Sequence, residues 1–211
     1  ADNENIHDTE LSSEAIAKLP ETVDLRSHHV QVRSQGHCGS CWSFGCLATI
    51  EYAFAELKNI TTGHLSTQEM VDCASNQHYL NMACDFGLSD QAYDYVVDNG
   101  IYQDRFYPYH ASKGICKNET EIMKKHEKIH ISGYNIIPQG SNDSVIMEVL
   151  ANKGPITTAI KIDVDFKHYK TGIVKNVNKG AIFVNHVLAL IGYTTINQTD
   201  VWIVVNSWGR T

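Results

Sequence analysis

The chain has 211 residues, of which 43% are hydrophobic, and a formal net charge of −7; this length fits one compact domain or two lobes that share a cleft. Residues 1–18, with five acidic residues and one lysine, carry more than half of that charge. The remaining body has no basic cluster to suggest a nucleic-acid partner, and no apolar run approaches the ~18 residues that a membrane span needs.

A helix is predicted from about Cys41 to Lys58, because apolar residues recur there along one stripe. The motif from His37 to Trp42, which reads His-Cys-Gly-Ser-Cys-Trp, leads directly into this helix. Cys41 therefore lies at the helix N-terminus, where free N–H groups and the positive end of the helix dipole favour a thiolate. This position predicts a nucleophilic cysteine.

A Cys-x-x-Cys pair is also typical of zinc knuckles and of redox dithiols. A zinc site needs a second ligand pair of similar spacing, and the other cysteines form no second such pair. A thioredoxin-type pair follows a strand in a βαβ unit, and no such pattern precedes Gln35. The nucleophile is the favoured interpretation, and we expect neither a metal ion nor a cofactor.

Three further helices are expected. Residues 66–73 begin with a Ser-x-x-Glu capping box. Ser89 is expected to cap a helix that runs through Val97 and ends before Gly100. A last helix is expected over residues 143–152, closed by a Gly-Pro pair, and the remaining pattern after residue 116 is mostly typical of strands.

Two apolar runs near the end of the chain, residues 181–193 and 201–208, are predicted to form a hairpin with residues 194–200 as its loop. His186 and Asn206 interrupt these runs, and hairpin pairing brings them within about two residues of register. Buried polar groups need hydrogen-bond partners. By itself the pair is most simply a satisfied core histidine; together with Cys41 it becomes a candidate base with its orienting group.

Several sequence blocks, in order, resemble the papain-like cysteine proteases of the cathepsin L-like type. They are Leu19–Asp24, Gln35–Phe44, Leu65–Cys73, Phe106–Tyr109, Gly154–Ile156, Asn185-His186 and Asn206–Gly209. Residues 24–26 and 71–75 add a hint of the mite group 1 allergen branch. The resemblance implies an α+β, two-lobe fold: a mainly helical lobe over residues 19–120, a β-barrel-like lobe over residues 121–211, and the active-site cleft between them.

The resemblance also implies a cysteine endopeptidase that works through an acyl-enzyme. Cys41 is then the nucleophile, paired at rest as a thiolate with the imidazolium of His186, and His186 is the base and later the acid. Asn206 orients the imidazole, and Trp208 shields that contact from water. The Gln35 side chain and the Cys41 backbone N–H form the oxyanion hole.

The residues that the resemblance places around the substrate are Gly39, Gly87, Leu88, Ala159, Asn185, Val187 and Trp208. Those expected in the S2 subsite are neutral, and most are apolar, which predicts Leu, Val or Phe at P2. Residues 84–87 read Cys-Asp-Phe-Gly where the family usually has Cys-Asn-Gly-Gly. Phe86 is therefore expected to crowd the S3 side.

By the same resemblance, Cys38 pairs with Cys84 and Cys73 with Cys116, each disulfide contributing roughly 4 kcal/mol in the chain-entropy model. Cys46 is then a small buried hydrophobe or, less simply, a regulatory thiol. Glycosylation sequons begin at Asn59, Asn118, Asn142 and Asn197. Disulfides and sequons together indicate the secretory pathway, with a secreted or lysosomal location.

Residues 1–18 are expected to be a propeptide remnant or an N-terminal extension, and the barrel to be cut short at its C-terminal end, because relatives continue beyond this point. The expected partners are peptide or protein substrates, cystatin-type inhibitors and the protein's own prosegment. Neither a nucleic acid nor a membrane is expected as a partner, and the protein is expected to be a monomer. Two alternatives are a non-catalytic homologue or allergen, which would usually lack Cys41 or His186, and an exopeptidase of the same fold. For an exopeptidase, residues 76–85 are too short to form an obvious occluding loop.

Overall fold

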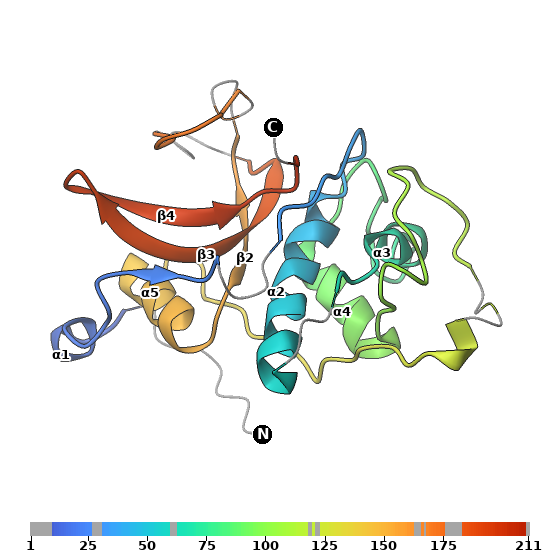
Figure 1. Ribbon diagram of the computed structural model, residues 1–211, viewed down its shortest axis with the longest axis horizontal. Coiled ribbons are helices and arrows are strands. Elements are labelled where there is room, and N and C mark those ends of the chain that lie inside the picture. Colours follow the sequence, from blue (N-terminus) through green and yellow to red (C-terminus); the bar gives the residue numbers. More distant parts are fainter. Residues whose placement is uncertain are drawn as a thin grey trace.

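The computed structural model describes residues 10–26, 31–59, 63–117, 120, 123–162, 166, 168–175 and 183–209. Helix α2 (Cys41–Lys58) lies between a helical part and a sheet (Figure 1). Helices α3 (Thr67–Cys73) and α4 (Ser89–Asn99) contact α2 on one side, and the sheet contacts it on the other. This arrangement confirms the predicted α+β class.

The helices α2, α3 and α5 (Asp143–Asn152) have the predicted bounds. The Ser66 hydroxyl accepts a bond from the Glu69 backbone N–H at 2.9 Å, as the capping box predicts. The Ser66 N–H donates instead to the carbonyl of Tyr102 at 2.8 Å, which leaves the Glu69 carboxylate available to other partners.

The predicted start of α4 is wrong by one residue. Leu88 is the N-cap, no side chain caps the helix, and Ser89 is the first helical residue. The backbone N–H of Leu88 donates to the Asn81 side chain at 2.8 Å, so a distant side chain holds the entry to the helix. The helix ends at Asn99, with Gly100 at a φ of 66°, a conformation that glycine adopts readily.

The sheet is built around β3 (His186–Ile196). β1 (Val23–Asp24) and β2 (Ile156–Ile160) pair with successive parts of β3 along one edge, and β4 (Thr199–Val205) pairs along the other, all antiparallel. These described strands form an open sheet, so the expected β-barrel-like closure is not found. A barrel needs enough tilted strands to return to the first one, and β1 is only two residues long.

The β3–β4 hairpin has a shorter loop than predicted. Its turn is Asn197-Gln198 alone, with φ values of 49° and 62°, as in a type I′ turn. The strands continue through exposed polar residues because backbone pairing requires no apolar side chains, and the hydroxyl of Thr195 donates to Asp200 across the ladder at 2.7 Å.

The strand prediction after residue 116 also fails in part: the described residues between 117 and 142 include the short 3-10 helix η1 (Met123–Lys125) but no strand.

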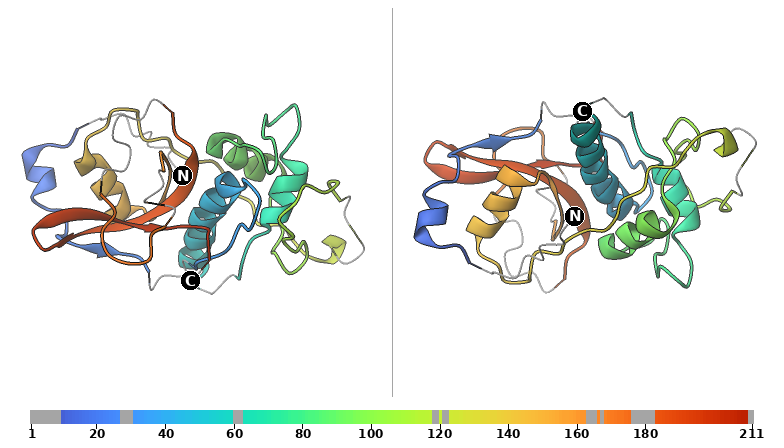
Figure 2. Two further views of the ribbon diagram at one scale, coloured as in Figure 1. Left: turned by 90° about the horizontal axis from the view of Figure 1, so that it is seen from above. Right: turned by 90° about the horizontal axis from the view of Figure 1, so that it is seen from below.

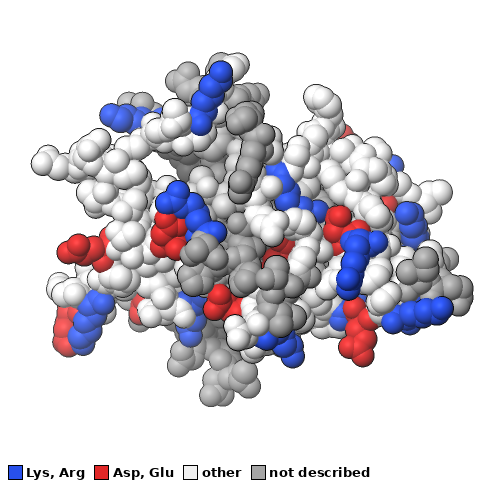
Figure 3. Space-filling model, in the orientation of Figure 1, with Lys and Arg blue, Asp and Glu red and all other residues white. Residues whose placement is uncertain are grey.

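Helix α5 packs on the sheet through Leu150, which lies in a cluster with Leu190 and Tyr193 of β3. The short helix α1 (Ser13–Ile16) lies at the outer end of the sheet, away from α2, in all three ribbon views (Figures 1 and 2). Acidic and basic side chains are interspersed on the face shown in Figure 3. Among the described residues, no helix combines the length and apolarity required to cross a membrane.

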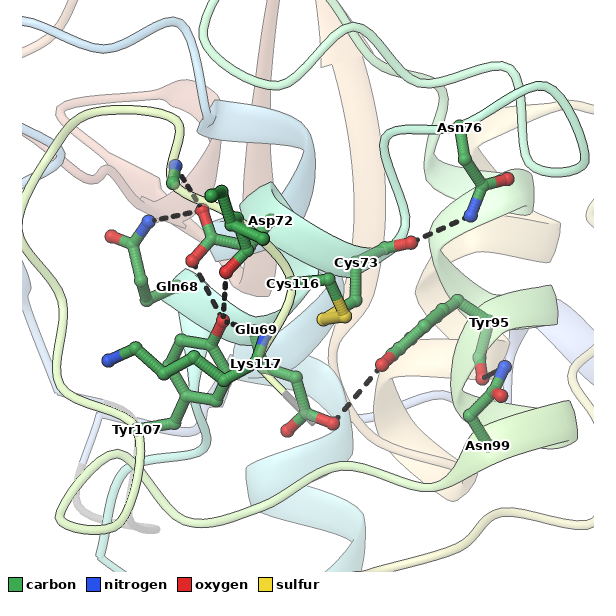
Figure 4. The surroundings of a disulfide bond; sticks show 12 residues. Gln68, Glu69, Asp72, Cys73, Asn76, Tyr95, Asn99, Tyr107, Cys116 and Lys117 are labelled. Atoms are coloured by element: carbon green, nitrogen blue, oxygen red, sulfur yellow. Dashed lines mark hydrogen bonds between the residues drawn. A yellow bond between two sulfur atoms is a disulfide. The ribbon is translucent and has the colours of Figure 1, made fainter. Parts of the chain in front are cut away.

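Helix α3 is buried along its whole length although four of its seven residues are polar or charged. Figure 4 shows how Asp72 is satisfied there: it accepts bonds from the hydroxyl of Tyr107 at 2.8 Å, the amide of Gln68 at 2.8 Å and the backbone N–H of Gly114 at 2.6 Å. The next residue, Cys73, forms the disulfide with Cys116. Asp72 therefore ties α3 to the segment that carries Tyr107 and Gly114.

Replacing Asp72 with alanine is expected to lower the free energy of unfolding by about 3 kcal/mol, because hydrogen bonds to a buried charged group are among the strong ones. Urea unfolding under non-reducing conditions measures this change. The control is Asp90→Ala, at an exposed position in the first turn of α4, which should change stability little. Equal effects of the two substitutions would contradict the role given to Asp72.

Candidate active site

Cys41 is the first residue of α2, as the sequence predicts. Ser40 is the N-cap, but its side chain makes no capping bond, and its hydroxyl lies 2.7 Å from that of Tyr109 instead. No capping side chain therefore accepts from the first backbone N–H groups of α2. These N–H groups and the positive end of the helix dipole lie at the start of the helix, where Cys41 is.

The segment before Cys41 is fixed to the loop that follows α3. A disulfide joins Cys38 to Cys84, and the backbone N–H of Gly39 donates to the Cys84 carbonyl at 2.7 Å. A side chain on Gly39 would collide with that same carbonyl. Because Cys38 is bonded to Cys84, the zinc and dithiol interpretations of the Cys-x-x-Cys pair are excluded.

His186, the first residue of β3, and Asn206, which directly follows β4, come together. Nε2 of His186 lies 2.7 Å from Oδ1 of Asn206, which also accepts the backbone N–H of Ser207 at 2.8 Å. Since that oxygen can only accept, Nε2 carries a proton, and in the neutral ring the basic nitrogen is Nδ1. The ring of Trp208 lies 4.8 Å from that of His186, centroid to centroid, and the histidine is buried.

The backbone N–H of Val187, the residue that follows His186, lies close enough to the sulfur of Cys41 to act to lower the pKa of that thiol. The start of α2 and the start of β3 therefore meet. This contact places the candidate nucleophile beside the strand that carries the candidate base.

Gln35 is buried, and its side-chain amide is bonded at both ends. Nε2 donates to the carbonyl of Cys38 at 2.8 Å, and the hydroxyl of Ser207 donates to Oε1 at 2.6 Å. Because the Cys38 carbonyl can only accept, the end of the amide that faces it is the N–H donor, and the Ser207 hydroxyl donates to the other end. An N–H donor is thus held beside the segment that leads into Cys41.

The ionisation of the two reactive groups depends on competing effects. Burial raises the pKa of Cys41, while the backbone N–H groups of Val187, Trp42 and Cys41 itself act to lower it. Burial lowers the pKa of His186, and the bond to Asn206 acts in the opposite direction. Both burial effects favour the neutral forms. A thiolate–imidazolium pair therefore requires the mutual attraction of the two charges, which is strong where water is excluded.

The residues expected around the substrate take several positions. Ala159 and Val187 are partners in the β2–β3 ladder, so their side chains share one face of the sheet. Ala159 is exposed, whereas Val187 is buried against α2. The Asn185 side chain is engaged by the backbone of Ile162, at 2.8 and 3.3 Å, and so acts in the structure as a link between strand ends.

On the helical side, Gly87 packs against the indole of Trp42, so closely that a Cβ there would collide with the ring. Leu88 is 41% exposed and Phe86 is 51% exposed. The segment after Cys84 therefore presents apolar side chains to solvent next to the disulfide that fixes Cys41.

Ser207 and Tyr109 also belong to the site, although the sequence alone does not predict a role for them there. Ser207 donates to Gln35, and the hydroxyl of Tyr109 donates to the Gln35 carbonyl at 2.8 Å while contacting Ser40. A serine next to Asn206 carries a weak signal by itself, since its partner lies far away in the sequence. Both residues hold the segment around the candidate oxyanion donor.

The remaining predicted sites lie at the surface or in disulfides. The pairs Cys38–Cys84 and Cys73–Cys116 are both present, and Cys41 and Cys46 are free thiols. Among the sequons, Asn59 is the C-cap of α2, Asn142 is the N-cap of α5 and Asn197 is in the hairpin turn, all three exposed. Asn118 lies outside the described residues, as do residues 1–9 of the N-terminal segment.

Comparison with known proteins identifies the family. The family model described as Papain family cysteine protease matches residues 19–211. The chain belongs to the papain family of cysteine proteases. A low-temperature-induced cysteine proteinase of Solanum lycopersicum is 37% identical over 198 residues, which cover 90% of this chain and 53% of that protein. The chain spans about half the length of the curated papain-family relatives it matches first.

Solved structures of the papain family agree with this assignment. The digestive procathepsin L 3 of the Tenebrio molitor larval midgut superposes with a TM-score of 0.83 at 32% identity, over 98% of this chain and 65% of that one. A structure from work on antibody cross-reactivity between the mite allergens Blo t 1 and Der p 1 has a TM-score of 0.85 at 29% identity, over 99% and 66%. The papain-like fold is therefore shown, with an insect cathepsin L and a mite allergen both among its structural neighbours.

Proposed function

We propose that this papain-family chain carries the catalytic centre of a cysteine endopeptidase. One arrangement supports the proposal most strongly: a buried His186, oriented by Asn206, begins the strand that packs against helix α2, and Cys41 is the first residue of that helix. A nucleophile, a base and an orienting group are the parts that covalent catalysis by a thiol requires.

In the proposed reaction, the thiolate of Cys41 attacks the peptide carbonyl carbon, and the carbonyl electron pair moves onto oxygen. The Gln35 amide and the Cys41 backbone N–H stabilise this oxyanion, each donor contributing about 10²–10³ in rate. Collapse expels the amine, which takes its proton from His186, and leaves a thioester on Cys41. Water then gives a proton to His186 and attacks the thioester, which releases the acid product and the thiolate.

The structure offers no support for the non-catalytic alternative. Cys41, His186 and Asn206 are present, and the first two lie on elements that contact each other. The Gln35 amide, which a binding protein would not need to orient, is held by Ser207 at 2.6 Å.

A panel of fluorogenic dipeptide amides tests the function and its specificity together. The proposed S2 residues Leu88, Ala159 and Val187 are apolar and Asn185 is neutral, so substrates with Leu, Val or Phe at P2 should exceed the Arg substrate in kcat/KM by about tenfold or more. Alkylation with iodoacetamide before the assay is the control and should remove all turnover. A preference for Arg at P2 would contradict the specificity, and turnover that survives alkylation would contradict the function.

The cellular setting follows from the same proposal. Two disulfides indicate an oxidising compartment, so we propose a secreted or lysosomal protein with glycans on exposed sequons. Residues 1–18 are proposed to be the remnant of a prosegment; of these, the described residues 10–18 contact the body through Glu10, which accepts the Asn142 amide at 3.0 Å. Peptide substrates, cystatin-type inhibitors and the prosegment are the proposed partners of a monomer.

A further inference from the structure

Helix α2 and strand β3 approach each other closely at Gly45, one turn after Cys41. A Cβ on Gly45 would lie 2.7 Å from Cγ1 of Val187 and 3.4 Å from the carbonyl oxygen of Leu188, so a larger residue would force the strand away. Val187 follows His186, and its backbone N–H lies close enough to the sulfur of Cys41 to act on the pKa of that thiol. The spacing of helix and strand at Gly45 therefore also sets the spacing of nucleophile and base.

Three hydroxyl groups meet beside this point and are called the hydroxyl cluster: Thr49 of α2, Tyr93 of α4 and Thr157 of β2. The hydroxyl oxygens of Thr49 and Tyr93 are 2.5 Å apart, and those of Tyr93 and Thr157 are 2.7 Å apart. The Thr49 hydroxyl donates to the Cys46 carbonyl at 2.8 Å, and the Thr157 hydroxyl donates to the Gly45 carbonyl at 3.0 Å. The cluster thus joins three elements.

The donors and acceptors of the hydroxyl cluster can be assigned by counting protons. Each hydroxyl has one proton, and both threonine protons go to carbonyls of α2, so the Tyr93 hydroxyl donates to a threonine oxygen. Burial raises the pKa of Tyr93 far above its ordinary value, so the phenol keeps its proton and remains a donor. Stacking on Tyr134, with ring centroids 4.9 Å apart, fixes the ring.

Thr157 links the position of α2 to β3, the strand that carries His186. It pairs with Ala189 in the β2–β3 ladder, and its hydroxyl holds the backbone of α2 at Gly45. Movement of the sheet away from α2 would break the Thr157–Gly45 bond and separate Val187 from Cys41.

We propose that the hydroxyl cluster positions the catalytic pair: Thr157, through its bond to the Gly45 carbonyl, holds His186 of β3 at working distance from Cys41 of α2. The inference rests on the proposed function, because it requires Cys41 and His186 to react as a pair. Thr157 is a positioning residue, since it touches the helix backbone and not the reacting atoms.

The test is Thr157→Val, which keeps the side-chain shape and removes the hydroxyl. The Gly45 carbonyl still accepts its helical N–H from residue 49, so no buried acceptor is left without a partner. The matched control is Thr158→Val, the same change one residue along β2, where the side chain points to the other face of the strand. Thr157→Ser restores the hydroxyl and should restore the wild-type behaviour.

The readout is the rate of Cys41 alkylation by iodoacetamide as a function of pH, measured by mass spectrometry on the whole protein without substrate. A looser pair stabilises the thiolate less, so the pKa of Cys41 should rise by about one unit, and at pH values below the wild-type pKa Thr157→Val should react about tenfold more slowly than wild type. The two rates should converge in the alkaline range, where both sulfurs are ionised. A defect in overall folding alone would not produce this pH-dependent convergence.

Gly45→Ala changes the same distance between α2 and β3 by adding bulk to the helix, because its methyl group pushes against Val187. It should shift the pH profile in the same direction as Thr157→Val. Wild-type profiles for both variants would overturn the inference and leave the proposed function standing. If wild-type Cys41 itself reacts only at alkaline pH, the proposed function fails as well, so the two failures are distinguishable.

Discussion

Replacing Cys41 with alanine is expected to abolish peptide hydrolysis, with kcat falling by about 10⁵-fold or more, as for removal of the nucleophile in other covalent proteases. The sulfur is the atom that forms the acyl-enzyme in the proposed reaction, and the other free thiol cannot replace it, since Cys46 is fully buried inside α2. The fold should survive because Cys41 is only partly buried and lies at the helix end. Hydrolysis of a fluorogenic dipeptide amide and the urea midpoint measure the two effects.

The matched control is Cys46→Ala, which removes the other free thiol from the same helix. Burial raises the pKa of Cys46 well above its ordinary value, so this group stays a neutral thiol at neutral pH and should not react with iodoacetamide. Activity should therefore persist in Cys46→Ala. Labelling of Cys46 in preference to Cys41 in the wild-type protein would refute the assignment of the nucleophile.

Replacing His186 with alanine is expected to move the reactivity of Cys41 into the alkaline range. Without the imidazolium, burial dominates and holds the pKa of Cys41 above its ordinary value. A raised pKa means that the neutral thiol persists below it, so the alkylation rate should climb only as pH rises through that value. At about pH 6 the rate should fall at least about 100-fold relative to wild type.

Alkylation by iodoacetamide over a range of pH measures this shift, and peptide hydrolysis should disappear in parallel. His78→Ala is the control, because that histidine side chain is 75% exposed and lies on the loop after α3. Its profile should match that of the wild type. Should His186→Ala keep its reactivity in the acid range, the helix N-terminus alone would be activating Cys41, and the role of His186 as the paired base would be wrong.

The features that the sequence predicts well are those with local causes. The helix that begins at Cys41 and the capping of α3 by Ser66 depend on residues a few positions apart. The pairing of His186 with Asn206 also follows from a hairpin, in which register is set by the turn. For these, periodicity and turn chemistry contain nearly all the necessary information.

The features that the sequence does not predict depend on distant partners. The start of α4 at Ser89 is set by Asn81, and the orientation of Gln35 is set by Ser207 at the other end of the chain. The open sheet depends on how many strands meet around β3, which no local pattern specifies. The opposing effects on the pKa of Cys41 likewise arise from burial, a property of the assembled lobes.

The β3–β4 hairpin affects the order in which the parts of the site assemble during folding. The base and its orienting group lie on one continuous ribbon closed by a two-residue turn, so their contact involves a short loop and a small entropic cost. The nucleophile belongs to a helix whose core cluster comes mostly from the helical part, and this cluster includes Val187 of the ribbon, so the two meet only when the two parts dock. Reactivity is therefore a property of the interface, and it should be lost under mild denaturation before either part loses its secondary structure.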